Sequence, residues 1–102
     1  MVKVSVLYPN TAGSRFDRDY YFNRHMPMVQ RLLGAALKGV SIESGISGAT
    51  LTPFVMTCHL VFESAAAFAE AFNPHAAEIM GDIPNYTDVQ PVIQLGEIKV
   101  SQ

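Results

Sequence analysis

Alternation of hydrophobic and polar residues with a period of two predicts two clear β-strands, at residues 2–8 and 54–63. Pro9 and the turn-forming residues after it end the first of these strands. Weaker patterns of the same kind predict strands at residues 40–47 and 92–100. Residues on one face of the two clear strands are all apolar: Val2, Val4, Val6, Tyr8, Phe54, Met56, Cys58, Leu60 and Phe62.

Two other segments carry apolar residues at the three- and four-residue spacing of an amphipathic helix. Asp17 is placed to cap the first helix, and Ser64 to cap the second. Each helix contains a proline, Pro27 or Pro74. Because Pro27 lacks an N–H, we expect a kink or break near His25, with Pro27 starting a second helical piece. The apolar stripes are Tyr21, His25, Met28, Val29, Leu32 and Ala36, and then Phe68, Phe72, His75, Ile79 and Ile83.

These elements follow one another in the order β-α-β-β-α-β, with turns at Gly39 and at Gly48-Ala49-Thr50. Right-handed connections then give a four-stranded antiparallel sheet with both helices on one face. We therefore expect one α+β domain over residues 1–102, with a ferredoxin-like fold.

The predicted strand at residues 54–63 is apolar on both faces, apart from Thr57 and His59. The helices of this topology cover only one face of the sheet. Two identical sheets packed face to face would cover the other, so we expect a homodimer that pairs through the sheet. Alternatively, the strand is central in the sheet and its second face is half exposed.

Composition and charge narrow the classes of partner. Of the 102 residues 49 % are hydrophobic and 16 % are charged, against about 25 % charged in an average domain. The formal charge is −2 and the seven basic residues are scattered, which argues against nucleic-acid binding. No apolar stretch approaches the roughly 20 residues of a membrane span, and no secretory leader is recognisable. The single cysteine, Cys58, cannot form an internal disulfide, so we expect a cytoplasmic protein that does not bind membranes.

His25 is the first candidate for catalysis. It lies in the middle of the apolar stripe of the first helix, and an imidazole is suited to proton transfer near neutral pH. Alternatively, it is a buried histidine that is satisfied by a backbone carbonyl near Pro27. His75 holds the matching place on the second helix, so the two histidines either converge on one cavity or fill separate parts of the core.

Four more residues are candidates for binding a substrate. Tyr21 and Tyr86 each combine a ring that lines a pocket with a hydroxyl that orients a ligand, and Met28 would add an adaptable apolar wall. Asp82 either orients an imidazole or pairs within its own loop. Alternatively, Tyr21 and Tyr86 pack at the edge of the core with their hydroxyls in solvent, as we expect for Tyr20, and Met28 only fills the core.

Metal and cofactor motifs are missing from the sequence. There is no His-x-x-x-His or Glu-x-x-His spacing, and His59 is expected on the opposite face of the sheet from the other histidines. Nothing resembles a nucleophile elbow, a phosphate-binding glycine loop or a dinucleotide fingerprint. Cys58 shares its strand face with Phe54 and Phe62, which indicates a buried, inert thiol. We therefore expect no metal and no cofactor.

The chain resembles the EthD family, a branch of the dimeric α+β barrel proteins. The resemblance covers nearly the whole chain. The matching segments in their order along the chain are more specific to the family than any one segment alone. The matching residues are Tyr8-Pro9, Phe16-Asp17-Arg18-Asp19-Tyr20-Tyr21, His25-Met26-Pro27, Phe62-Glu63-Ser64, Ala67-Phe68, Phe72, Asp82-Ile83-Pro84-Asn85-Tyr86-Thr87-Asp88, Pro91 and Gln94.

The resemblance implies a ferredoxin-like fold whose sheet pairs with a second copy to form a barrel. It also implies a role in the degradation of ethers and other small organic compounds, beside a cytochrome P450 system, or in polyketide-type metabolism. Fungal relatives act in polyketide and aromatic biosynthesis as decarboxylases or dehydratases, and wider barrel relatives include cofactor-free monooxygenases, lactone isomerases and haem-binding enzymes. Their ligands commonly lie between sheet and helices, the side that His25 and Tyr21 face here, although a shared fold does not by itself establish an activity.

Two functional hypotheses follow. As an enzyme, the protein would bind a small aromatic or alicyclic compound between helices and sheet, with His25 as general acid or base and His75 or Tyr86 orienting it or donating a proton. As a non-catalytic module, it would bind or carry a hydrophobic intermediate and assist a partner oxygenase. The sequence leaves both hypotheses open.

Overall fold

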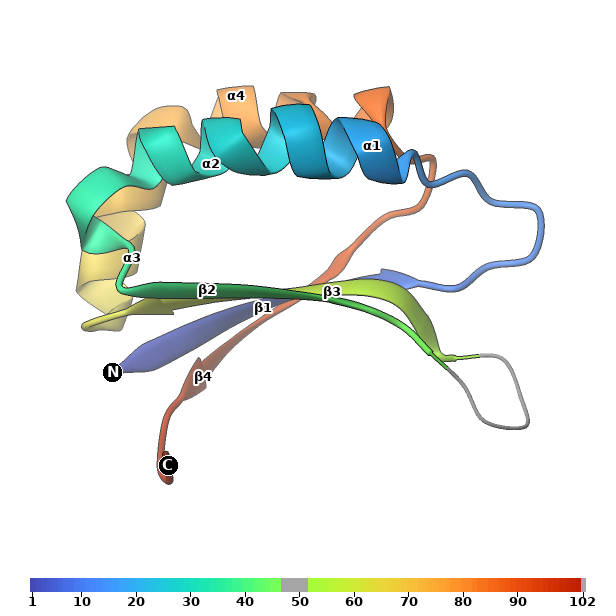
Figure 1. Ribbon diagram of the computed structural model, residues 1–102. Helices are drawn as coiled ribbons and strands as arrows, with labels where there is room; N and C mark the ends of the chain where they lie inside the picture. The colour runs from blue at the N-terminus through green and yellow to red at the C-terminus, as the bar shows by residue number, and fades with distance from the viewer. Residues whose placement is uncertain (47–51, 102) are drawn as a thin grey trace.

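A computed structural model describes residues 1–46 and 52–101 of the chain, and Figure 1 shows its two layers. One layer is an antiparallel sheet with the strand order β2-β3-β1-β4, as expected for a ferredoxin-like α+β fold. Helices form the other layer and cover one face of the sheet. The strands are β1 (Val2–Pro9), β2 (Gly39–Ser44), β3 (Phe54–Phe62) and β4 (Val92–Glu97).

The register of the sheet explains the alternating pattern. Val6 of β1 pairs with Cys58 of β3 on one side and with Ile93 of β4 on the other. These residues therefore share the face that the helices cover. Alternate residues of β3, from Met56 to Phe62, are buried on this face, so the apolar face expected from the sequence is confirmed.

Each of the two helical runs begins at the residue that was expected to cap it. The Asp17 carboxylate accepts a hydrogen bond from the Tyr20 backbone N–H at 3.1 Å, and the Ser64 hydroxyl accepts one from Ala67 at 3.0 Å. The first helical run consists of α1 (Arg18–Tyr20), the π-helical turn η1 (Tyr21–His25), α2 (Met26–Leu33) and the 3₁₀ turn η2 (Gly34–Ala36). The second consists of α3 (Ala65–Phe72), η3 (Asn73–His75), α4 (Ala76–Gly81) and η4 (Ile83–Asn85).

The expected break near His25 is instead a π-helical turn within a continuous run of helix (Figure 1). The Met26 backbone N–H donates to the carbonyl of Tyr21, five residues earlier. Pro27 then lies in the first turn of α2, where a missing N–H is tolerated. The wider turn rotates the following residues about the helix axis, and this shift changes which residues face the sheet.

The helical stripe is corrected accordingly. Met26, Val29 and Leu33 are buried, whereas Met28 and Leu32 are only half-buried at the edge of the core. The helix also ends earlier than the sequence suggested, because Gly34 has a positive φ of 59° and closes it. Gly39, expected as the closing turn, starts β2 instead. The turn expected at residues 48–50 lies outside the described residues.

The sheet face away from the helices carries a line of polar side chains across three strands. The Ser5 hydroxyl lies 2.9 Å from His59 Nδ1, and His59 Nε2 lies 3.1 Å from Glu43 Oε1. Thr57 donates a hydrogen bond to the same carboxylate oxygen at 2.8 Å. Val61 on this face is half-buried in the single chain. Within the described part of the chain, no helix is both long and apolar enough to cross a membrane.

Candidate active site

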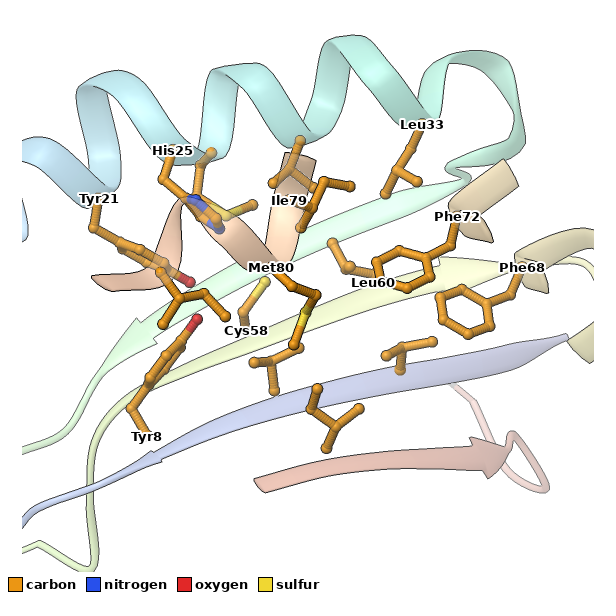
Figure 2. Close-up of a pocket in the computed structure, with 16 residues that line it drawn as sticks. Tyr8, Tyr21, His25, Leu33, Cys58, Leu60, Phe68, Phe72, Ile79 and Met80 are labelled. Atoms are coloured by element: carbon orange, nitrogen blue, oxygen red, sulfur yellow. The ribbon is translucent and has the colours of Figure 1, made fainter. Parts of the chain in front are cut away.

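A cavity of about 210 Å³ lies between the helices and the covered face of the sheet (Figure 2). Most of its wall is aliphatic, phenylalanine or methionine side chain from β1, β3, α2, α3 and α4. Polar groups reach it only at one end, from Tyr8, Tyr21 and His25, with the Cys58 thiol nearby. Such an apolar pocket with a few convergent polar groups is typical of a small-molecule site.

Two separate elements supply the polar end. Tyr8 is near the end of β1, on the same face as Val4 and Val6, and its ring is buried. Tyr21 and His25 both lie on the π-helical turn, where their rings stack with centroids 5.7 Å apart and an interplanar angle of 16°. The π turn therefore presents a phenol and an imidazole side by side to the end of β1.

Asp82 holds His25 from behind. Its Oδ2 lies 2.9 Å from His25 Nδ1. Its other oxygen accepts hydrogen bonds from the Tyr20 hydroxyl at 2.6 Å and from the Asn85 amide at 2.9 Å. Because the carboxylate is fixed by these neighbours, it can fix the ring of His25 in turn. Both contacts considered for Asp82 are present: it bonds the imidazole of His25, and it pairs with Asn85 in its own loop.

The protonation states of this pair follow from burial and hydrogen bonding. Desolvation lowers the pKa of His25, although the hydrogen bond and charge of Asp82 partly oppose the shift. For Asp82, desolvation favours the neutral acid, but hydrogen bonds from Tyr20, Asn85 and His25 outweigh it and lower the pKa. At neutral pH the pair is thus an ionised aspartate and a neutral imidazole. Since a carboxylate only accepts, His25 carries its proton on Nδ1, and Nε2 is left as an acceptor.

Tyr86 connects this acceptor to the cavity wall. Its hydroxyl lies 3.4 Å from His25 Nε2 and 2.6 Å from the Tyr8 hydroxyl. Because Nε2 can only accept, Tyr86 donates to it and accepts a hydrogen bond from Tyr8. The result is a directed chain that runs from the cavity through Tyr8, Tyr86 and His25 to Asp82.

The phenols and the thiol of the site are neutral. Burial raises the pKa of Tyr8 to about 12, and it raises the pKa values of Tyr21 and Tyr86 further. Burial also raises the pKa of the Cys58 thiol to about 11, so this residue is not an activated nucleophile. These groups can donate or pass a proton, but none of them supplies a resident charge.

The candidate residues from the sequence take different places. His25 and Tyr21 line the cavity, whereas Tyr86 and Asp82 form its hydrogen-bonded support. Met28 lies at the edge of the core, and Met26 lines the cavity in its place. The structure does not bring His75 to the cavity: it ends the 3₁₀ turn η3 and is not among the lining residues.

Sequence reasoning missed Tyr8 and underrated Tyr20. Tyr8 was visible as the one hydroxyl-bearing residue on an otherwise valine-lined strand face, which is the signal that could have identified it. The Tyr20 hydroxyl was expected in solvent, but it donates to Asp82. Over residues 1–46 and 52–101, no group of three or more histidine, cysteine or acidic side chains is arranged to hold a metal ion.

Comparison with known proteins identifies the family. The model of the EthD domain matches residues 12–90. An EthD-like protein from Ralstonia eutropha is 45 % identical, with a TM-score of 0.91 over 99 % of this chain and 94 % of that one. An ethyl tert-butyl ether D (EthD) family protein from Bacillus halodurans is 17 % identical, with a TM-score of 0.69 over 96 % and 98 % of the two chains.

A monooxygenase candidate from Shewanella loihica shares the fold at 10 % identity, with a TM-score of 0.65 over 98 % of this chain and 95 % of that one. None of the curated proteins compared with the chain matches it. The EthD domain model matches most of the chain, and the alignment with the Ralstonia protein covers almost all of it. The chain belongs to the EthD family.

Proposed function

We propose that the protein is an enzyme that carries out histidine acid–base chemistry on a small hydrophobic or aromatic compound bound between helices and sheet. The observation that carries this proposal is the hydrogen-bonded chain from the cavity wall at Tyr8, through Tyr86, to the His25–Asp82 pair. A buried neutral histidine held by an ionised carboxylate is the usual arrangement of a general base.

The chain defines the path of a proton. A substrate proton moves to the Tyr8 oxygen while the Tyr8 proton moves to Tyr86 and the Tyr86 proton moves to His25 Nε2. The bonding electrons stay on the substrate, which becomes an anion, and the imidazolium that forms is stabilised by Asp82. Reversal of the same steps returns a proton to another atom of the substrate. Such a cycle is an isomerisation. In a dehydration the returned proton would instead leave with a substrate hydroxyl group as water, and in a cofactor-free monooxygenation the substrate anion would pass its electrons to O₂.

Family membership supports a setting in small-molecule metabolism. It is consistent with degradation of ethers and other xenobiotics or with polyketide-type metabolism, and a fold neighbour is itself named as a monooxygenase candidate. The single cysteine is buried and free, which is consistent with the reducing cytoplasm that we propose for the protein.

A substrate panel with matched histidine variants tests the proposal. Quinols, lactones and cyclic ketones are incubated with wild type, with His25→Ala and with His75→Ala. We expect His25→Ala to lower turnover about 10²- to 10⁴-fold. His75→Ala removes a histidine that lies outside the cavity, so it should retain wild-type turnover. Equal turnover by wild type and His25→Ala would remove His25 from the mechanism.

The almost wholly apolar wall favours one second candidate, a carrier of a hydrophobic intermediate that assists a partner oxygenase. A carrier would bind the same compounds without turnover. Its affinity would also be the same at pH 5.5 and pH 7.5, because no step depends on the protonation of His25. The enzyme proposal instead requires affinity or turnover to change over this range.

We also propose that two copies pair through the sheet face away from the helices. The half-buried Val61 and the exposed Val92 leave apolar surface on this face of the single chain. A second copy would cover this surface symmetrically and leave no further sheet face open.

A further inference from the structure

We propose that the Tyr21 hydroxyl is the anchor of the ligand, and that the cavity takes an uncharged ring compound whose carbonyl oxygen accepts a hydrogen bond from it. This inference rests on the proposed function only in that it places the ligand in the same cavity. It adds the chemical class of the ligand and the residue that selects it.

The Tyr21 hydroxyl is buried but has no hydrogen-bond partner. Its residue is 1 % exposed, and over the described residues it is the buried side-chain polar atom that remains unsatisfied. Buried hydroxyls are normally paired, because a donor removed from water without an acceptor is costly. An unpaired donor at a cavity wall is therefore a position at which a ligand atom would complete the site.

The neighbouring Tyr8 and Cys58 side chains are not hydrogen-bonded to Tyr21. Figure 2 shows the Tyr8 and Tyr21 hydroxyls pointing toward one another at the same end of the cavity, with Cys58 beside them. Tyr8 donates its own proton to Tyr86 at 2.6 Å and its oxygen keeps lone pairs, but no hydrogen bond joins it to Tyr21, and the Cys58 thiol is only a weak acceptor. A carbonyl oxygen at this end of the cavity would accept from Tyr21, and an acidic proton next to that carbonyl would then be close to the Tyr8 oxygen.

The electrostatics of the site disfavour an anion. No lysine or arginine is among the residues that line the cavity. The Asp82 carboxylate, which bonds His25, places a negative charge near the polar end of the cavity. Desolvation lowers the pKa of His25 and so keeps it from supplying a positive charge at neutral pH. A carboxylate ligand would be buried without a counter-ion, which is unfavourable.

The volume limits the size of the ligand. The cavity measures about 210 Å³. An apolar cavity of roughly 150 Å³ is large enough to bind benzene, so this one has room for a ring with a short carbonyl substituent. Ile93 and Met80 also line the cavity and are 50 % and 38 % exposed, which places an apolar opening between β4 and α4.

Two nearly isosteric probes test the inference. Acetophenone carries a carbonyl oxygen, and α-methylstyrene has a CH₂ group at the same position. Calorimetric titration at pH 7.5 should show that wild type binds the ketone about tenfold more tightly than the alkene. Tyr21→Phe should bind the two probes equally. Ser14→Ala removes an exposed hydroxyl from the loop before α1 and should keep the wild-type preference.

Several results would overturn the inference. These are equal affinities in wild type, a preference that survives in Tyr21→Phe, failure of both probes to bind, or benzoate binding as tightly as acetophenone. The outcome is separable from that of the proposed function. His25→Ala should keep the ketone preference while it loses turnover, whereas a preference in wild type without any turnover would contradict the enzyme proposal alone.

Discussion

At the scale of single residues, the site depends on hydrogen-bond direction more than on charge. Asp82 can only accept, so it assigns the proton of His25 to Nδ1 and leaves Nε2 facing Tyr86. The same reasoning directs the Tyr8 proton toward Tyr86. Tyr21, one helical turn before His25, is left outside this chain with its donor free. The hydroxyls of Tyr8 and Tyr86 are therefore hydrogen-bonded in the folded protein, whereas that of Tyr21 is not.

This difference predicts different effects of two Tyr-to-Phe variants on the free energy of unfolding. Tyr86→Phe breaks the hydrogen bonds to Tyr8 and His25, so its free energy of unfolding should fall by about 1–3 kcal/mol. Tyr21→Phe removes an unpaired hydroxyl and should leave the free energy of unfolding unchanged or slightly higher. Urea denaturation of the two variants at pH 7.5 measures both. A larger loss in Tyr21→Phe than in Tyr86→Phe would contradict the assigned hydrogen bonds.

The pKa of His25 predicts how stability depends on pH. Because this pKa is lowered in the folded protein, the unfolded chain binds a proton more readily below the ordinary value of 6.5. The free energy of unfolding should therefore fall as the pH drops through 6.5 toward the folded pKa. Because the pKa of Asp82 is also lowered, the free energy of unfolding should fall again as the pH drops below 3.8.

Urea denaturation at pH 7.5 and pH 5.5 checks the first of these losses. His25→Gln keeps a polar side chain but cannot titrate. Its free energy of unfolding should therefore decrease less between pH 7.5 and pH 5.5 than that of wild type. A decrease of the same size in both proteins would show that His25 does not titrate with a lowered pKa.

At the scale of elements, the caps and the sheet were predictable and the π turn was not. Asp17 and Ser64 are local signals that need no tertiary information, because each side chain bonds the backbone three residues later. The turn at Tyr21–His25 depends on a Met26 N–H that bonds five residues back instead of four. Residue spacing alone assumes a regular helix, so it placed Met28 rather than Met26 over the cavity.

The π-helical turn brings Met26 instead of Met28 to the sheet, and this makes a direct prediction for variants of the two residues. Met26 is 4 % exposed and lines the cavity, so Met26→Ala should lower the free energy of unfolding by about 2–5 kcal/mol. Met28 is half-buried at the core edge, and Met28→Ala should lower it by less. Thermal or urea unfolding of both variants provides the comparison. A greater loss of stability in Met28→Ala than in Met26→Ala would mean that Met28 faces the sheet, as it would in a regular α-helix.

At the scale of the whole molecule, the fold was predictable but the assembly of the site was only partly so. The strand order follows from the β-α-β-β-α-β pattern, and family membership agrees with it. The site joins the end of β1, the π turn and the loop after α4, which are far apart in sequence. The matching positions of His25 and His75 left open whether they share a cavity or fill separate parts of the core. The second helical run changes to a 3₁₀ turn at Asn73–His75, and His75 does not line the cavity.

Pairing of two chains through the sheet is the prediction at this scale. Wild type should sediment as a dimer at micromolar concentration in analytical ultracentrifugation. Val61→Asp places a charge on the sheet face away from the helices and should shift the protein toward monomer. Gln30→Asp, on an exposed position of α2, is the matched control and should remain dimeric. A monomeric wild type would contradict the proposed pairing.

The central claim is that His25 exchanges protons with a ligand in the cavity. Acetophenone incubated with the protein in D₂O reports this directly, because loss of its methyl proton signal in NMR measures proton abstraction next to the carbonyl. We expect wild type and His75→Ala to exchange these protons at the same rate, and His25→Ala to be slower by about 10²-fold or more. Exchange at the same rate in wild type and His25→Ala, or no exchange above that of buffer, would contradict the claim.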